Sequence, residues 1–138
     1  MLVFIKFSHT LKLHWQKYQS RILHTKNKKG GFMIQIGNNI IVNTDDIDDV
    51  KSAKLLNCVA LTCGLKLNST ITASSISEEG FTFCLQRAIF SLSNRRIPQQ
   101  EFNIKCHREP SDIFQYLALV TILILCDVDP KVFEFIRF

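Results

Sequence analysis

The sequence predicts an α+β protein: a basic amphipathic N-terminal helix, then a small layer of short strands and two apolar helices at about 76–93 and 111–126. Three observations predict this class. A stripe of apolar residues at helical spacing lies near the start of the chain, β-branched runs with turn signals begin at Met33, and two later apolar segments follow helix-start residues. Strands and helices do not alternate regularly, which favours separate layers over a βαβ repeat.

The first 32 residues differ in charge from the rest of the chain. They carry seven lysine or arginine side chains and no Asp or Glu, whereas residues 33–138 hold ten basic and twelve acidic side chains. We therefore divide the chain into a basic head, 1–32, and a small α+β domain, 33–138. The head is interpreted as a working segment, a targeting segment or an extension that is not translated. With 46% apolar residues, the chain is not of the disordered class.

An apolar stripe in the head predicts a helix over about residues 2–24. The stripe consists of Phe4, Phe7, Leu11, Trp15, Tyr18 and Ile22. Three interpretations follow: a mitochondrial address, an arm that binds nucleic acid or anionic lipid, and a helix packed on its own domain. Against the first, Arg21 is the one arginine among these lysines. The side chains expected to contact a partner or membrane are Lys6, Lys12, Trp15, Lys17, Tyr18 and Arg21.

The segment after Met33 predicts short strands. "MIQIGNNIIVN" has β-branched residues around a turn signal at Gly37, which indicates two strands or one bulged strand. A short capped helix or turn follows at 44–54, with Thr44 as N-cap and the Asp run at the positive end of the helix dipole. Alternating apolar residues then predict a strand at about 57–67 and a short partner at 70–73.

The next segment predicts the first apolar helix. Ser75 and Glu78 have the spacing of a capping box. The helical stripe expected after them consists of Phe81, Leu85, Ala88, Ile89 and Leu92. Alternation in "EFNIKCH" predicts a half-buried strand with Asn103 and Lys105 on its polar side, and "KVFEFIRF" predicts a terminal strand or an adhesive tail.

Residues 113–126 are apolar except for a glutamine and a threonine. As a helix, these 14 residues extend about 21 Å, whereas the hydrocarbon core of a bilayer is about 30 Å thick. This length favours a central core helix over a membrane span. The residues expected in the core, or in a membrane if the segment anchors the chain, are Leu117, Leu119, Ile122 and Leu123.

The sequence offers little for catalysis, metal binding or cofactor binding. Five cysteines form an odd set without a CxxC pair, which is typical of thiols in a reducing intracellular compartment. The acidic run 45–49 lacks the calcium-loop pattern, and on a strand Cys106 and His107 point to opposite faces. No nucleophile elbow, phosphate loop or dinucleotide fingerprint is present. We therefore predict no catalytic residue, no metal and no cofactor.

These observations predict a small non-enzymatic accessory protein that contacts an unknown protein partner or an anionic membrane surface. One alternative is a mitochondrially targeted or membrane-anchored protein, with residues 1–29 as address and 113–126 as anchor. Another is a nucleic-acid-binding module that uses the lysine-rich head. Arg95 and Arg96, with Lys105 and Arg108, are a separate candidate for a small basic patch. A last alternative is the product of an unselected reading frame that has no function.

Overall fold

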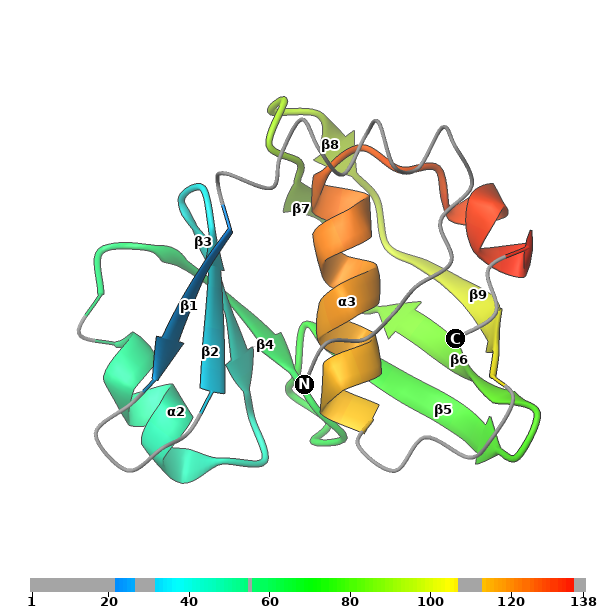
Figure 1. Ribbon diagram of the computed structural model, residues 1–138, viewed down its shortest axis with the longest axis horizontal. Helices are drawn as coiled ribbons and strands as arrows, with labels where there is room; N and C mark the ends of the chain where they lie inside the picture. Colours follow the sequence, from blue (N-terminus) through cyan, green and yellow to red (C-terminus); the bar gives the residue numbers. More distant parts are fainter. Residues whose placement is uncertain (1–21, 27–31, 55, 107–112, 136–138) are drawn as a thin grey trace.

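Strands dominate the fold of the computed structural model, which describes residues 22–26, 32–54, 56–106 and 113–135 (Figure 1). One seven-stranded sheet has the order β1-β2-β3-β4-β5-β6-β9. Its strands are β1 (Ile22–Lys26), β2 (Phe32–Ile36), β3 (Asn39–Asn43), β4 (Val59–Cys63), β5 (Ile71–Ser77), β6 (Gly80–Leu85) and β9 (Gln100–Lys105). The other elements are the ribbon β7 (Ile89–Phe90) and β8 (Arg96–Ile97), the helices α2 (Ile47–Ala53) and α3 (Ile113–Leu125), and the 3-10 helix η2 (Pro130–Phe135).

The β1–β4 half of the sheet has a helix on each face. Ile40 and Val42 of β3 pack with Ala53 of α2 in a small cluster on one face. Ile41 points to the opposite face and belongs to the main core, together with most of α3. Because β3 lies between two helices, its three central residues are all buried, as is typical of a central strand in an α/β layer.

The sheet is mixed, with parallel and antiparallel strands, and it is staggered between β4 and β5. Strands β3, β4 and β5 are parallel, while β1–β2, β2–β3, β5–β6 and β6–β9 are antiparallel. β5 begins beside the last residue of β4, so the β5–β6–β9 half continues beyond the end of β4. Helix α3 stands between the two halves (Figure 1).

The inner face of the β5–β6–β9 half packs against α3 and η2. Phe81, Phe83 and Leu85 of β6 alternate along the strand and are all buried in the main core. The Phe83 ring stacks on Phe102 of β9, and Phe102 in turn stacks on Phe133 of η2, with ring centroids 5.0 and 5.4 Å apart. These contacts attach the C-terminal 3-10 helix to the sheet.

The prediction of an α+β fold with two apolar helices is wrong, because most of the predicted helix 76–93 is strand. Phe81, Phe83 and Leu85 fit a period of two better than a helical stripe, since Thr82 and Cys84 lie between them on the other face. Gly80, at a φ of 141°, begins β6 where the helix was expected to continue. The later apolar segment does form a helix, α3.

Three smaller predictions also need correction. Ile22 and His24, predicted as the end of the head helix, lie in β1 and pair with β2; the earlier part of that helix lies outside the described residues. The N-cap of α2 is Asp46, whose Oδ1 accepts the N–H groups of residues 48 and 49, and not Thr44. Residues 130–135 form η2 instead of a strand.

Candidate functional site: a polar hollow at the β5–β6 turn

The face of β5, β6 and β9 that is turned away from α3 is polar; we call it the outer face. Strand register places its side chains in two rows across the three strands. The rows are Thr72, Cys84 and Glu101, and Ser74, Thr82 and Asn103. Within the second row the Thr82 hydroxyl donates to Asn103 Oδ1 at 2.9 Å, so these two residues form a fixed polar floor.

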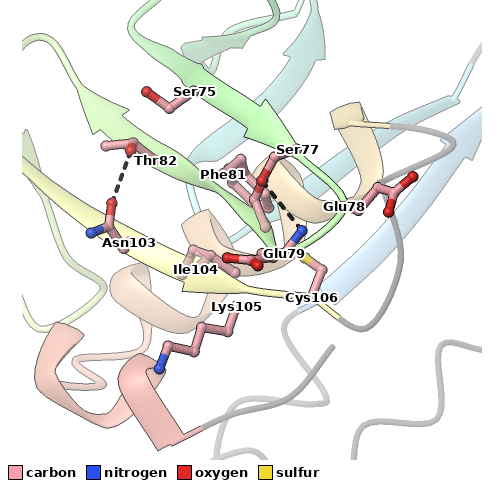
Figure 2. A pocket seen from close by; sticks show the side chains of 11 residues that line it. Ser75, Ser77, Glu78, Glu79, Phe81, Thr82, Asn103, Ile104, Lys105 and Cys106 are labelled. Carbon is pink, nitrogen blue, oxygen red and sulfur yellow. Dashed lines mark hydrogen bonds between the residues drawn. The ribbon is translucent and has the colours of Figure 1, made fainter.

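An open hollow of about 700 Å³ lies at the end of this face, beside the β5–β6 turn. Figure 2 shows the side chains that surround it. The lining residues are Ser75, Ser77, Glu78, Glu79, Gly80, Phe81, Thr82, Asn103, Ile104, Lys105 and Cys106. Seven of the eleven lining residues are polar or charged, but apolar atoms make up the larger part of the exposed lining, and buried Phe81 and Ile104 connect it to the core.

A β-bulge shapes the β5 wall of the hollow. Ser74 pairs with Thr82 and Ser77 pairs with Gly80, so two residues of β5, Ser75 and Ile76, oppose one residue of β6. Ser75 has a φ of 50°, the left-handed conformation that glycine usually supplies at the first position of a G1 bulge. The bulge bends β5, and both of its residues are exposed.

Hydrogen bonds of the turn hold the acidic side of the hollow. The Glu79 N–H donates to Ser77 Oγ at 3.2 Å, and the Ser77 hydroxyl donates to the Gly80 carbonyl at 3.4 Å. Glu78 and Glu79 occupy the turn between the two strands and are exposed. The Lys105 side chain extends away from both carboxylates, toward η2 (Figure 2). The turn therefore presents two negative charges at one end of the hollow.

Both thiols near the hollow are kept in the neutral form. Burial raises the pKa of Cys84; the negative charge of Glu101 acts in the same direction, against a weaker opposing hydrogen bond from Ser74. Burial also raises the pKa of Cys106. Because the thiolate is the nucleophile in cysteine catalysis, these raised pKa values disfavour such chemistry at the hollow.

The structure separates the residues that the sequence singled out. All six head residues proposed as contacts, Lys6, Lys12, Trp15, Lys17, Tyr18 and Arg21, lie outside the described residues. Leu117, Ile122 and Leu123 of α3 are buried in the core, and Leu119 is half-buried. Among the described helices none has the length and apolar content needed to cross a bilayer.

The acidic run 45–49 is used within the fold. Asp46 caps α2, and Asp45 Oδ2 accepts the Leu65 N–H at 3.3 Å, while Asp49 is 1% exposed. In the described ranges no group of three or more His, Cys, Asp or Glu residues is arranged to hold a metal ion.

The sequence analysis did not predict the hollow, although the sequence does indicate one of the strands that line it. The polar side of β9, with Asn103 and Lys105, follows from alternation in the sequence. The assignment of 76–93 to a helix hid the turn that brings Glu78 and Glu79 beside that strand. Compared with known proteins, the chain matches no family model and no curated protein.

Proposed function

We propose that this protein is a non-enzymatic accessory protein that binds a basic segment of a partner protein in the hollow at the β5–β6 turn. The observation that carries the proposal is the pair of exposed carboxylates, Glu78 and Glu79, beside a hollow of about 700 Å³. Oppositely charged surfaces steer two proteins together and fix their register, so a lysine- or arginine-bearing segment complements this end of the hollow.

The size and shape of the hollow support a segment of polypeptide as its ligand. Its volume falls within the range of about 300–1,000 Å³ that is typical of small-molecule and cofactor sites, so it has room for a few side chains of a bound segment. Since it is open to solvent along the outer face, an extended segment can enter without a change in the sheet. The Asn103 amide, held by Thr82, is placed in the floor to exchange hydrogen bonds with such a segment.

The chemistry of the lining supports binding over catalysis. Nucleophilic catalysis needs an activated nucleophile beside a base, whereas both nearby thiols have raised pKa values. The hydroxyl of Ser77 is engaged in hydrogen bonds of the turn, and its partners are backbone groups of Glu79 and Gly80. These groups hold the shape of the turn.

Selection from a random peptide display library tests the proposal. We expect peptides enriched on the wild-type protein to be rich in Lys and Arg. Their affinity should fall about tenfold in the Glu78→Gln/Glu79→Gln double variant, which corresponds to about 1.4 kcal/mol. Glu101→Gln, a carboxylate change on the same face outside the hollow, is the matched control and should bind as the wild type does. Binders without basic residues, or equal loss in both variants, would contradict the proposal.

An anionic membrane surface is a second candidate partner, and the basic head is the segment that would bind it. Seven basic and no acidic side chains lie within residues 1–32, and each is worth about 1 kcal/mol near an anionic bilayer. Sedimentation with phosphatidylserine-containing vesicles, with phosphatidylcholine vesicles as control, separates this contact from the hollow. Loss of binding on deletion of residues 1–21 supports it; equal sedimentation with both vesicles contradicts it. Mitochondrial import, nucleic-acid binding by the head, and the absence of any function stay predictions.

A further inference from the structure

The three serines of β5 differ in what their hydroxyl groups contact. The Ser77 hydroxyl donates to the Gly80 carbonyl at 3.4 Å, and Ser74 Oγ lies 3.6 Å from Cys84 Sγ. The Ser75 hydroxyl has no hydrogen-bond partner within the described residues. It is exposed and lines the hollow. Ser75 is therefore the serine of this strand that can be modified without the loss of a contact that supports the fold.

The chain around Ser75 is accessible over a continuous stretch. All residues from 74 to 79 are exposed. Among the described residues β4 joins β5 at a single register pair, at the start of β5, so residues 72–77 have a strand partner on the β6 side alone. The bulge leaves Ser75 and Ile76 outside that ladder, so a small local displacement of this stretch breaks few hydrogen bonds. An enzyme can therefore reach the Ser75 hydroxyl and the residues that follow it.

The charges after Ser75 fit an acid-directed protein kinase, a kinase whose substrates carry acidic residues after the acceptor hydroxyl. Glu78 is the third residue after Ser75 and Glu79 the fourth, and both are exposed. No lysine or arginine occurs between Lys66 and Arg87, so no basic residue of this stretch opposes a basic substrate groove. Kinases select substrates by such charge patterns, through attraction to the right residues and repulsion of the wrong ones.

We propose that Ser75 is a phosphorylation site of an acid-directed protein kinase, and that its phosphate strengthens the binding of a basic segment in the hollow. The second half of this inference rests on the proposed function, whereas the first half does not. In the transfer, Ser75 Oγ forms a bond to the γ-phosphorus of a nucleoside triphosphate, and the bond from that phosphorus to the bridging oxygen breaks. The nucleoside diphosphate leaves, and the hydroxyl proton passes to the catalytic base of the kinase.

A phosphate on Ser75 extends the negative charge around the hollow. Figure 2 shows Ser75 and Glu78 on different sides of it. Phosphoserine carries a charge of about −1.5 to −2 at pH 7 and three strong acceptor oxygens. A basic segment that spans the hollow then meets negative charge on both sides, and a lysine or arginine that faces the phosphate gains charge-assisted hydrogen bonds. We expect its affinity to rise about tenfold at low salt and less at high salt.

Phosphate incorporation tests the site without reference to a partner. The folded full-length protein is incubated with an acid-directed serine kinase and ATP, and peptide mapping by mass spectrometry locates the phosphate. We expect it on Ser75. Ser75→Gly removes the hydroxyl and suits the positive φ at this position, so incorporation should be lost while the circular dichroism spectrum is retained. Ser74→Ala is the matched control and should be phosphorylated as the wild type is.

The turn carboxylates should determine the rate of phosphorylation. We expect Glu78→Gln/Glu79→Gln to slow incorporation about tenfold or more, since the charges that attract the kinase are lost. Glu101→Gln changes a carboxylate on another strand and should leave the rate unchanged. Wild-type protein that takes up no phosphate, or takes it up at another residue, would overturn the proposal. So would equal rates in the double variant and the wild type.

Peptide titration tests the effect of the phosphate. A basic peptide selected on the unmodified protein is titrated into the wild type before and after complete phosphorylation, and into Ser75→Gly treated in the same way. We expect an affinity gain of about tenfold in the wild type and no gain in Ser75→Gly. An unchanged affinity would overturn the second half of the inference. If no basic peptide binds either form, the proposed function fails and the second half fails with it, while the location of the phosphate still decides the first half.

Discussion

Among the described residues, Cys63 and Ile71 form the single register pair that joins β4 to β5. Both side chains are fully buried. Helix α3 covers this junction, and Thr121 Oγ1 lies 4.0 Å from Cys63 Sγ. The two halves of the sheet therefore meet at a short backbone contact. Packing against α3 and the hydrogen bond from the Thr70 N–H to Thr62 Oγ1, at 2.8 Å, support this junction.

Burial at this junction predicts a protected thiol. It raises the pKa of Cys63 from 9.0 to about 12, against a weaker opposing hydrogen bond with Thr121. In the native protein at pH 8 we expect iodoacetamide to modify the half-buried Cys58 well before Cys63, and the two to react alike in denaturant. Peptide mapping by mass spectrometry measures both rates. Native modification of Cys63 at the rate of Cys58 would show that the junction is open.

The same raised pKa predicts a loss of stability in alkali. The folded state holds the Cys63 proton more tightly than the unfolded state does, so its contribution is complete below pH 9.0 and is lost as pH rises toward about 12. The urea midpoint should therefore fall from pH 8 to pH 10, and less so in Cys63→Ala. An identical fall in both proteins would assign the effect to other groups.

The C-terminus of α3 ends in a Schellman motif with Asp127 as the left-handed residue. The Val128 N–H donates to the Leu123 carbonyl and the Asp127 N–H to the Ile124 carbonyl, both at 3.0 Å, and Asp127 has a φ of 63°. Its Oδ1 accepts from Arg95 Nε at 3.2 Å. The side chain thus ties the end of α3 to the β7–β8 turn.

Asp127 should make stability depend on pH in acid. Burial, the largest single cause, raises its pKa, and hydrogen bonds from Ser93 and Ser91 oppose burial. Together with the charge and the hydrogen bond of Arg95 they outweigh burial and hold the pKa of Asp127 below its usual 3.8. Its contribution is therefore present above pH 3.8 and is lost as pH falls below that value.

Substitutions separate the role of the Asp127 backbone, which has a positive φ, from the role of its carboxylate. We expect Asp127→Ala to lower the free energy of unfolding by about 1–2 kcal/mol, because alanine is strained at positive φ and the carboxylate is lost. Asp127→Gly relieves the strain and should lose less. Urea titrations at pH 7 and pH 3 measure both. Equal losses at the two pH values would show that the carboxylate contributes nothing.

Local patterns in the sequence correctly predicted several elements that depend mainly on nearby residues. β2 and β3 follow from β-branched residues around Gly37, and α3 from an apolar run that only Gln115 and Thr121 interrupt. The helix at 76–93 was wrong because its apolar residues satisfy both periods, and pairing with β9 decides for the strand. The hollow depends on that pairing across the sheet, so only one of its walls, β9, was visible in the sequence.

Gly80 should be far less replaceable than Gly37. A Cβ at Gly80 would lie 1.9 Å from the Ile104 carbonyl oxygen, at a φ of 141°, so β9 would have to move. At Gly37 a Cβ meets the flexible end of Leu92 at 2.9 Å. We expect Gly80→Ala to cost about 3 kcal/mol or more and Gly37→Ala about 1 kcal/mol. Thermal unfolding compares them; equal costs would contradict the close β6–β9 approach.

Deletion of the head in two steps tests the place of β1 in the sheet. Removal of residues 1–21 leaves β1 intact, whereas removal of 1–31 also takes away the partner of β2 over all five register pairs. The shorter protein should unfold at a lower temperature and aggregate more readily, because β2 becomes an open edge. Differential scanning calorimetry and light scattering measure the difference. If both truncations behave alike, β1 contributes nothing to the sheet.

Binding of a basic segment at the β5–β6 turn is tested most directly by titration of a selected basic peptide into the wild-type protein and the Glu78→Gln/Glu79→Gln variant, at low and high salt. We expect saturable binding that weakens with salt and falls about tenfold in the variant at low salt. We also expect the two proteins to bind the peptide with similar affinity at high salt, where the carboxylates are screened. Binding of equal strength to both proteins at every salt concentration would show that the hollow at the β5–β6 turn is not the site.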